Sequence, residues 1–224
     1  GIAAGGTRLA KEVMDKVEGY KCQGGEKVFL SFVGNSLGGL YARYALSLLN
    51  WDQIVPCVFC TTATPHLGVS KHTYVPIPRS VEWVTANLMQ PTGKDLFRYS
   101  TVLEEMTFMD AFIEPLERFH KRIAYANAFW TDFQVPTTTG AFLSSSSSYP
   151  HITIEDPTPF VALRVETPKA SKREPTTDWS TSLDMLGWTK VFCDVRDGIP
   201  LPSIPLMFGQ DVLSKPSFQS RGTW

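Results

Sequence analysis

The sequence predicts an α/β fold with a largely parallel sheet, because short apolar runs alternate with helical patterns along the chain. Residues 28–33 are rich in β-branched and aromatic side chains, as in a buried strand. A helix is predicted on each side of this strand, over residues 7–17 and from Leu37 onward, since apolar residues recur there at helical spacing. Such alternation favours parallel strands joined by crossover helices.

The same patterns predict the strands and loops in the rest of the chain. Further strands are expected at residues 54–63, 122–129 and 187–195. Residues 65–121 form a long mixed interval with helical patches. We expect solvated loops where the chain is rich in serine, at residues 144–148, and in proline, threonine and lysine, at residues 167–177.

Composition sets limits on function. At 224 residues the chain is long enough for one large domain with a sizeable core. The 21 basic and 22 acidic residues leave a formal net charge of -1, which gives no electrostatic reason to expect nucleic acid or an acidic membrane as partner. No apolar run approaches the roughly 18 residues that span a bilayer.

The cysteines indicate neither a disulfide scaffold nor a metal site. Four cysteines are few for a chain of this size. Cys57 and Cys60 form a C-x-x-C pair inside an apolar run, and no second pair has zinc spacing. We interpret both as buried strand thiols and expect no metal and no cofactor.

A glycine-rich turn joins the strand at residues 28–33 to the helix that begins at Leu37. Its sequence is G-x-S-x-G, with Ser36 between Gly34 and Gly38. This strand–turn–helix order is the context of a nucleophile elbow, in which the two glycines avoid collisions around a strained serine and the Leu37 backbone N–H contributes to an oxyanion hole. The alternative is a plain turn in which small residues only allow close packing.

The residues around this turn resemble a known family. GNSLGGLYARYAL is similar to the nucleophile motif of the DUF676 serine esterase family of lipase-like α/β-hydrolases. Further segments resemble that family in the same order, over roughly residues 1–195: GIAAGGTRLAKEV, TATPHLG, TGKDLF, FHKRIAYANAFWTDFQVP and YPHI. The resemblance implies an α/β-hydrolase fold, with helices on both faces of a mostly parallel sheet, and hydrolysis of carboxylic esters, with lipid acyl esters as substrates.

An acid is expected after a strand downstream of the serine, because α/β-hydrolases have the chain order Ser, Asp or Glu, His. Asp132 follows the strand at residues 122–129, and the resemblance assigns the family's acid to the same position. Its carboxylate would orient a histidine and stabilise the imidazolium. Alternatives are a turn-capping role for Asp132, or an acid at Asp156, Asp194 or Asp197.

No histidine of the chain lies where this fold places its base, in the loop after the last strand. Of four histidines, His66, His72 and His120 precede Asp132, and we interpret His66 as a locally hydrogen-bonded turn residue and the other two as surface residues. His151 follows Asp132 but precedes the last predicted strand, whereas the base of this fold follows that strand. His151 is therefore a weak candidate, and we expect the base to lie beyond Trp224.

These expectations define a single partial domain over residues 1–224 that lacks upstream strands and a C-terminal end. The strand before Ser36 would then be an unpaired apolar edge, so we expect low solubility for this chain expressed alone. The interval 65–121 is either a lid over an acyl pocket or ordinary helical packing.

Two other functions remain open on the sequence alone. One is a non-catalytic hydrolase fold that binds lipid or protein, and the other is an acyltransferase or thioesterase that uses the same triad. An intracellular location, cytoplasmic or at a lipid surface, is favoured over secretion. The sequence leaves the oligomeric state and the compartment open.

Overall fold

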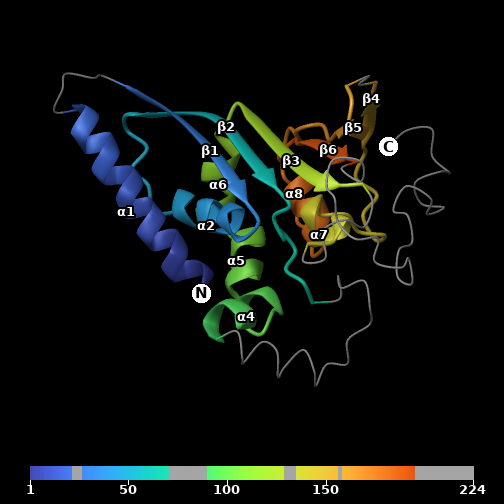
Figure 1. Ribbon diagram of the computed structural model, residues 1–224, viewed down its shortest axis with the longest axis horizontal. Helices are drawn as coiled ribbons and strands as arrows, with labels where there is room; N and C mark the ends of the chain where they lie inside the picture. The colour runs from blue at the N-terminus through green and yellow to red at the C-terminus, as the bar shows by residue number, and fades with distance from the viewer. Residues whose placement is uncertain (22–26, 71–89, 129–134, 156–157, 195–224) are drawn as a thin grey trace.

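The computed structural model describes residues 1–21, 27–70, 90–128, 135–155 and 158–194 (Figure 1). Helices and strands alternate along the chain, as the sequence predicted. The elements are α1 (Ile2–Lys21), β1 (Val28–Asn35), α2 (Leu37–Leu46), β2 (Ile54–Thr62), α4 (Gln90–Leu96), α5 (Val102–Phe108), α6 (Asp110–Glu117), β3 (Lys121–Asn127), α7 (Thr137–Gly140), β4 (Ile152–Ile154), β5 (Val161–Glu166), α8 (Trp179–Asp184) and β6 (Thr189–Cys193).

Six strands form one sheet in the order β1-β2-β3-β6-β5-β4. The first four are mutually parallel, and β5 and β4 add an antiparallel hairpin at the far edge. The four strands that the sequence predicted are the four parallel ones, so the expectation of a mostly parallel α/β sheet is confirmed. The hairpin was missed because β4 has only three residues and β5 has no fully apolar run.

The parallel strands end at a common edge of the sheet. Asn35, the last residue of β1, pairs with Thr62 of β2, which in turn pairs with Tyr125 of β3. The last residue of β3, Asn127, pairs with Cys193, the last residue of β6. The connections that follow β1, β2 and β3 therefore start side by side, about 5 Å apart from strand to strand.

An aromatic cluster forms the centre of the core. Phe59 of β2 is fully buried, and its ring centroid lies 6.1 Å from that of Phe32, 5.5 Å from that of Phe119 and 6.2 Å from that of Trp188. These separations lie within the range that favours tilted and edge-to-face aromatic contacts. The cluster therefore joins the β1 and β2 strands to the segments just before β3 and β6.

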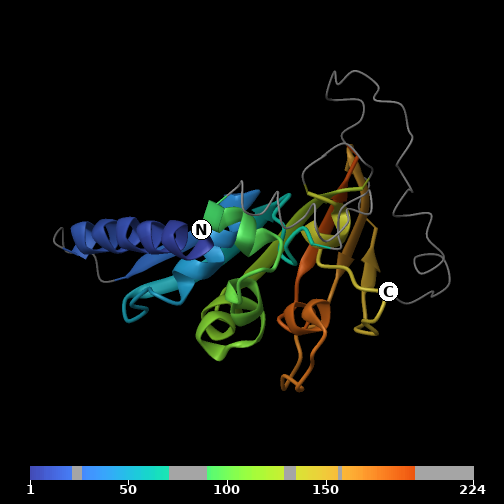
Figure 2. The same cartoon turned by 90° about the horizontal axis from the view of Figure 1, so that it is seen from below.

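The helices that pack on this core cover one face of the sheet. Side chains of α1, α2, α6 and α8 meet Phe32 and Phe59 in a single cluster, and α6 and α8 lie on the same side of the sheet (Figure 2). On the opposite face of β1, Phe29 is 74% exposed and Val33 is 78% exposed. The sequence predicted helices on both faces, and for the described residues that expectation is wrong.

The described part of the interval 65–121 packs as ordinary helices. Leu103 and Met106 of α5 are fully buried against Ile2 of α1 and Leu40 of α2. The helical patch that the sequence indicated at residues 81–89 lies outside the described residues. Among the residues that are described, no helix has the length and apolarity needed to cross a membrane.

Substitution of Phe59 by alanine tests the central place of this cluster. Because the side chain is fully buried among three aromatic rings, Phe59→Ala should lower the free energy of unfolding by about 3–5 kcal/mol. Phe29→Ala, on the exposed face of β1, should change it by no more than about 0.5 kcal/mol. Urea denaturation of both variants measures the difference, and similar losses would contradict the assignment of the two faces.

Candidate active site

Ser36 occupies a strained backbone conformation between β1 and α2. Its φ of 49° and ψ of -124° lie in a region that residues with a side chain rarely adopt. Its N–H donates to the Thr62 carbonyl over 2.8 Å, and its own carbonyl accepts from the Gly39 N–H over 3.2 Å. The side chain is partly exposed and makes no capping hydrogen bond to α2, so the hydroxyl stands at the edge of the sheet without capping the helix that follows.

Close packing around this turn requires glycine at two positions. A Cβ on Gly34 would lie 2.4 Å from the Gly39 Cα, and one on Gly39 would lie 2.1 Å from the Thr64 Oγ1. The sequence assigned the second steric role to Gly38, but a Cβ there meets nothing within 4 Å. That assignment is wrong, because Gly38 lies on the open side of the first turn of α2 while Gly39 faces the segment after β2.

The segment after β2, which we call the 63–68 loop (Ala63–Gly68), packs against the Ser36 turn. The Thr64 hydroxyl lies 3.4 Å from the Gly34 carbonyl and donates to it, and the Thr64 side chain packs on Gly39. Ala63, next to the Thr62 carbonyl that binds Ser36, also has a positive φ of 47°. Two strained residues thus lie beside each other at the carboxyl edge of the sheet.

His66 belongs to this loop and is fully buried. Its Nδ1 lies 3.2 Å from Nη1 of Arg43, and its Nε2 lies 3.0 Å from the Thr61 hydroxyl. Because a guanidinium can only donate, Nδ1 accepts and Nε2 carries the proton. Burial, together with the positive charges of Arg43 and Lys190, holds the pKa of His66 well below its usual value of 6.5. His66 is therefore a neutral, structural histidine with both ring nitrogens engaged.

Asp132 lies outside the described residues, and so do Asp156 and Asp197. The segments that flank residues 129–134 are described and well anchored. The Ala128 N–H donates to the Cys193 carbonyl over 2.8 Å, and the Thr137 hydroxyl donates to the Asn127 carbonyl. This connection begins at the same sheet edge as the Ser36 turn, two strands away, a lateral separation of about 10 Å.

His151 lies at the opposite edge of the sheet from Ser36. It precedes β4, whose first residue pairs with Glu166, and Glu166 pairs with Thr189 at the beginning of β6. Since β6 runs parallel to the strands that precede it in the sheet, its beginning marks the amino edge. The structure therefore does not bring His151 and Ser36 together.

The ring of His151 is engaged in a separate buried cluster. Its Nδ1 donates to the Tyr149 carbonyl over 2.9 Å, and its Nε2 accepts from Lys190 over 2.9 Å. Lys190, fully buried, also pairs with Asp184 at 2.7 Å. Burial and the adjacent ammonium lower the pKa of His151 to about 4, whereas burial raises the pKa of Asp184 to about 6.

The two remaining histidines add no candidate. His72 lies outside the described residues. His120 is exposed and precedes β3 directly, which places it at the amino edge. Asp194 follows β6 at the carboxyl edge, and its N–H donates to the Phe160 carbonyl over 2.8 Å.

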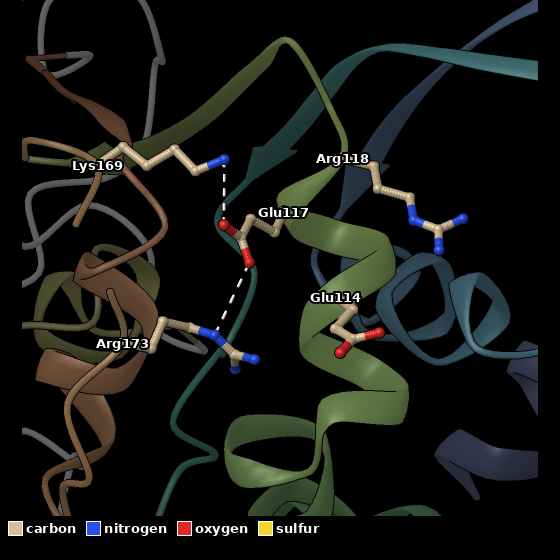
Figure 3. Close-up of a pocket in the computed structure, with 5 residues that line it drawn as sticks. All are labelled: Glu114, Glu117, Arg118, Lys169 and Arg173. Atoms are coloured by element: carbon tan, nitrogen blue, oxygen red, sulfur yellow. Dashed lines mark ion pairs between the residues drawn. The ribbon is translucent and has the colours of Figure 1, made fainter. Parts of the chain in front are cut away.

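A shallow charged depression of about 390 Å³ is lined by Glu114, Glu117, Arg118, Lys169 and Arg173 (Figure 3). Glu117 points from the end of α6 toward Lys169 and Arg173, at 3.1 and 3.7 Å. These residues belong to the end of α6 and the segment after β5, both at the amino edge of the sheet. Exposed ion pairs of this kind contribute little stability, so we interpret the depression as a solvated junction between the two segments.

Comparison with known proteins identifies the class. Residues 1–147 match the family described as "Putative serine esterase (DUF676)", and the chain belongs to this family. The resemblance that the sequence motifs indicated is thus confirmed.

A yeast protein named "Putative lipase ROG1", from Saccharomyces cerevisiae (strain ATCC 204508 / S288c), is 30% identical to the chain over 156 residues. That alignment covers 64% of this chain and 21% of the relative, so the chain matches about a fifth of the length of the yeast protein. No solved structure matches the chain.

Alanine substitutions at the two helical glycines test the packing of the Ser36 turn. Gly39→Ala should cost about 1–3 kcal/mol of stability, because its Cβ would collide with Thr64. Gly38→Ala should instead stabilise the chain by about 0.5–1 kcal/mol, since alanine in open space lowers the entropy cost of forming the helix. Urea denaturation measures both, and a larger loss at position 38 would contradict the packing described here.

Proposed function

We propose that this chain is the nucleophile-bearing part of a serine hydrolase that cleaves carboxylic esters on an α/β-hydrolase fold. The observation that carries the proposal is the strained conformation of Ser36 in a strand–turn–helix context. A strain of this kind persists only where the surroundings impose it, and it is found mainly at functional sites. A plain connection between β1 and α2 would need no such conformation.

The proposed reaction begins with attack of the Ser36 hydroxyl on the acyl carbonyl. A histidine takes the serine proton, and the backbone N–H of Leu37, at the start of α2, helps to hold the oxyanion. The alcohol then leaves with a proton from the same histidine, and water releases the acyl group from Ser36.

Asp132 is proposed as the acid that orients this histidine. Support comes from its connection, which starts at the carboxyl edge where the Ser36 turn also lies. The base itself is proposed to come from outside the described residues. Among the described histidines, His66 has both ring nitrogens engaged in buried contacts, and His120 and His151 lie at the amino edge.

Lipid acyl esters are the proposed substrate class. The family description supports an ester substrate, and the printed name of the yeast relative, a putative lipase, supports a lipid ester. The approach of a lipid surface to the carboxyl edge would follow from such a substrate and is part of the same proposal.

Ester hydrolysis by the full-length protein tests the proposal. With p-nitrophenyl butyrate as substrate, Ser36→Ala should lower kcat by more than about a thousandfold, because the nucleophile is lost. Ser47→Ala is a matched control at the other end of α2, where the hydroxyl donates to the Tyr44 carbonyl, and it should keep the rate.

Three results would contradict the proposal. An unchanged rate in Ser36→Ala would exclude Ser36 as the nucleophile. Absence of hydrolysis in the wild-type protein, with a range of acyl lengths, would favour a non-catalytic binding module. Transfer of the acyl group to an added thiol or alcohol in preference to water would indicate an acyltransferase instead.

A further inference from the structure

We infer that Arg43 is a positioning residue for the Ser36 turn: a buried guanidinium that, through His66, fixes the 63–68 loop on which the strained serine depends. The inference rests on the proposed function and adds to it a residue that does not touch the substrate. The family match and the triad hypothesis assign no role to Arg43.

The burial of Arg43 is the first observation. Its side chain is 2% exposed, and burial lowers the pKa of the guanidinium to about 10, which keeps it charged at neutral pH. Its partners among the described residues are the Met106 carbonyl at 2.8 Å, the His66 carbonyl at 3.4 Å and the His66 Nδ1 at 3.2 Å. Removal of a charge from water is costly, so a buried guanidinium needs hydrogen-bond acceptors placed around it.

The partners of Arg43 identify what it holds. One hydrogen bond ties it to the last turn of α5, and the two contacts to His66 tie it to the 63–68 loop. The His66 Nε2–H then points toward the hydroxyl of Thr61, inside β2. The Arg43 side chain therefore links α2 directly to the 63–68 loop and, through His66, to β2.

The 63–68 loop is also fixed from the side of α7. The Thr139 hydroxyl accepts from the Leu67 N–H over 3.0 Å and donates to the Gly68 carbonyl over 2.6 Å. The Thr139 carbonyl accepts from the His66 N–H over 3.2 Å. Since α7 follows β3 closely in sequence, these contacts tie the loop after β2 to the connection after β3.

These links matter because the loop imposes the strain at Ser36. The positive φ of Ala63 turns the chain so that Thr64 packs on Gly39 and donates to the Gly34 carbonyl. Without Arg43 and His66, Ala63 and Ser36 could relax to ordinary backbone angles. The hydroxyl of Ser36 would then move relative to groups on the neighbouring connections, and a shift of about 1 Å can lower turnover about a hundredfold.

Arg43→Met in the full-length protein is the first test, with Arg122→Met as its matched control. Arg122 is likewise a buried arginine that donates to backbone carbonyls, those of Phe119 and Gly187, but it does so at the amino edge of the sheet. Both variants are assayed at a temperature at which near-ultraviolet circular dichroism shows them folded. Arg43→Met should lower kcat by about ten- to a hundredfold with KM within about twofold, and Arg122→Met should keep both.

Thr139→Val repeats the test without any buried charge, should Arg43→Met fail to fold. The substitution is isosteric and removes only the hydroxyl that binds Leu67 and Gly68. Thr107→Val is its control, because that buried hydroxyl donates to the Leu103 carbonyl of its own helix. We expect a fall in kcat of about tenfold for Thr139→Val and none for Thr107→Val.

A spectroscopic readout separates positioning from general stability. Nitrogen-15 NMR of labelled His66 should show the proton on Nε2 in the wild type and in Arg122→Met, and a changed tautomer balance in Arg43→Met.

The outcomes distinguish this inference from the proposed function. If Ser36→Ala is inactive but Arg43→Met and Thr139→Val keep the wild-type kcat, the positioning role is wrong and the function stands. If each arginine variant loses turnover equally, Arg43 is merely structural and the inference is again overturned. If Ser36→Ala keeps its rate, the proposed function and the inference both fail.

Discussion

The strained backbone conformation of Ser36 constrains the residues that pack around it. A serine with φ of 49° has its side chain close to its own backbone, and nothing in its local sequence favours that state. It occurs where β1 and α2 pack so closely that Gly34 and Gly39 are in near contact. The loop after β2 then fills the remaining space with Thr64 and holds the Ser36 N–H through the Thr62 carbonyl.

The parallel sheet places the strained Ser36 turn beside the connections that follow the neighbouring strands. Because β1, β2, β3 and β6 all end at one edge, segments that are far apart in sequence start from neighbouring positions. The Ser36 turn, the 63–68 loop and α7 are joined there by hydrogen bonds through Thr62, His66 and Thr139. Among the buried charged side chains, Arg43 binds His66 of this network, while Lys190 pairs with Asp184 and donates to His151.

Much of this arrangement could be predicted from the sequence, because the four parallel strands are short apolar runs and α2 has apolar residues at helical spacing. The turn at Ser36 was recognisable from the spacing of glycines around a serine. Gly38 was mistaken for the packing glycine, because the direction of a Cβ depends on the helix that follows and on Thr64, which is distant in sequence. The β4–β5 hairpin was missed for a different reason, since it is held by pairing to β6 and not by its own composition.

The role of Arg43 leaves only a faint signal in the sequence. The residue lies within the apolar stripe of α2, where a charged side chain is unexpected on a face that packs on the core. That signal marks the residue as unusual, but it does not indicate what the guanidinium binds. Its partners come from α5 and from the 63–68 loop, and only the tertiary structure brings these together.

The most direct test of the central claim is to trap the reactive serine. The full-length protein is incubated with a fluorophosphonate, digested, and mapped by mass spectrometry. A phosphonate adduct on the peptide that contains Ser36, absent after prior denaturation, is the result that the strained, activated serine predicts. An adduct on a different serine of the chain, or no adduct on the folded protein, would contradict it.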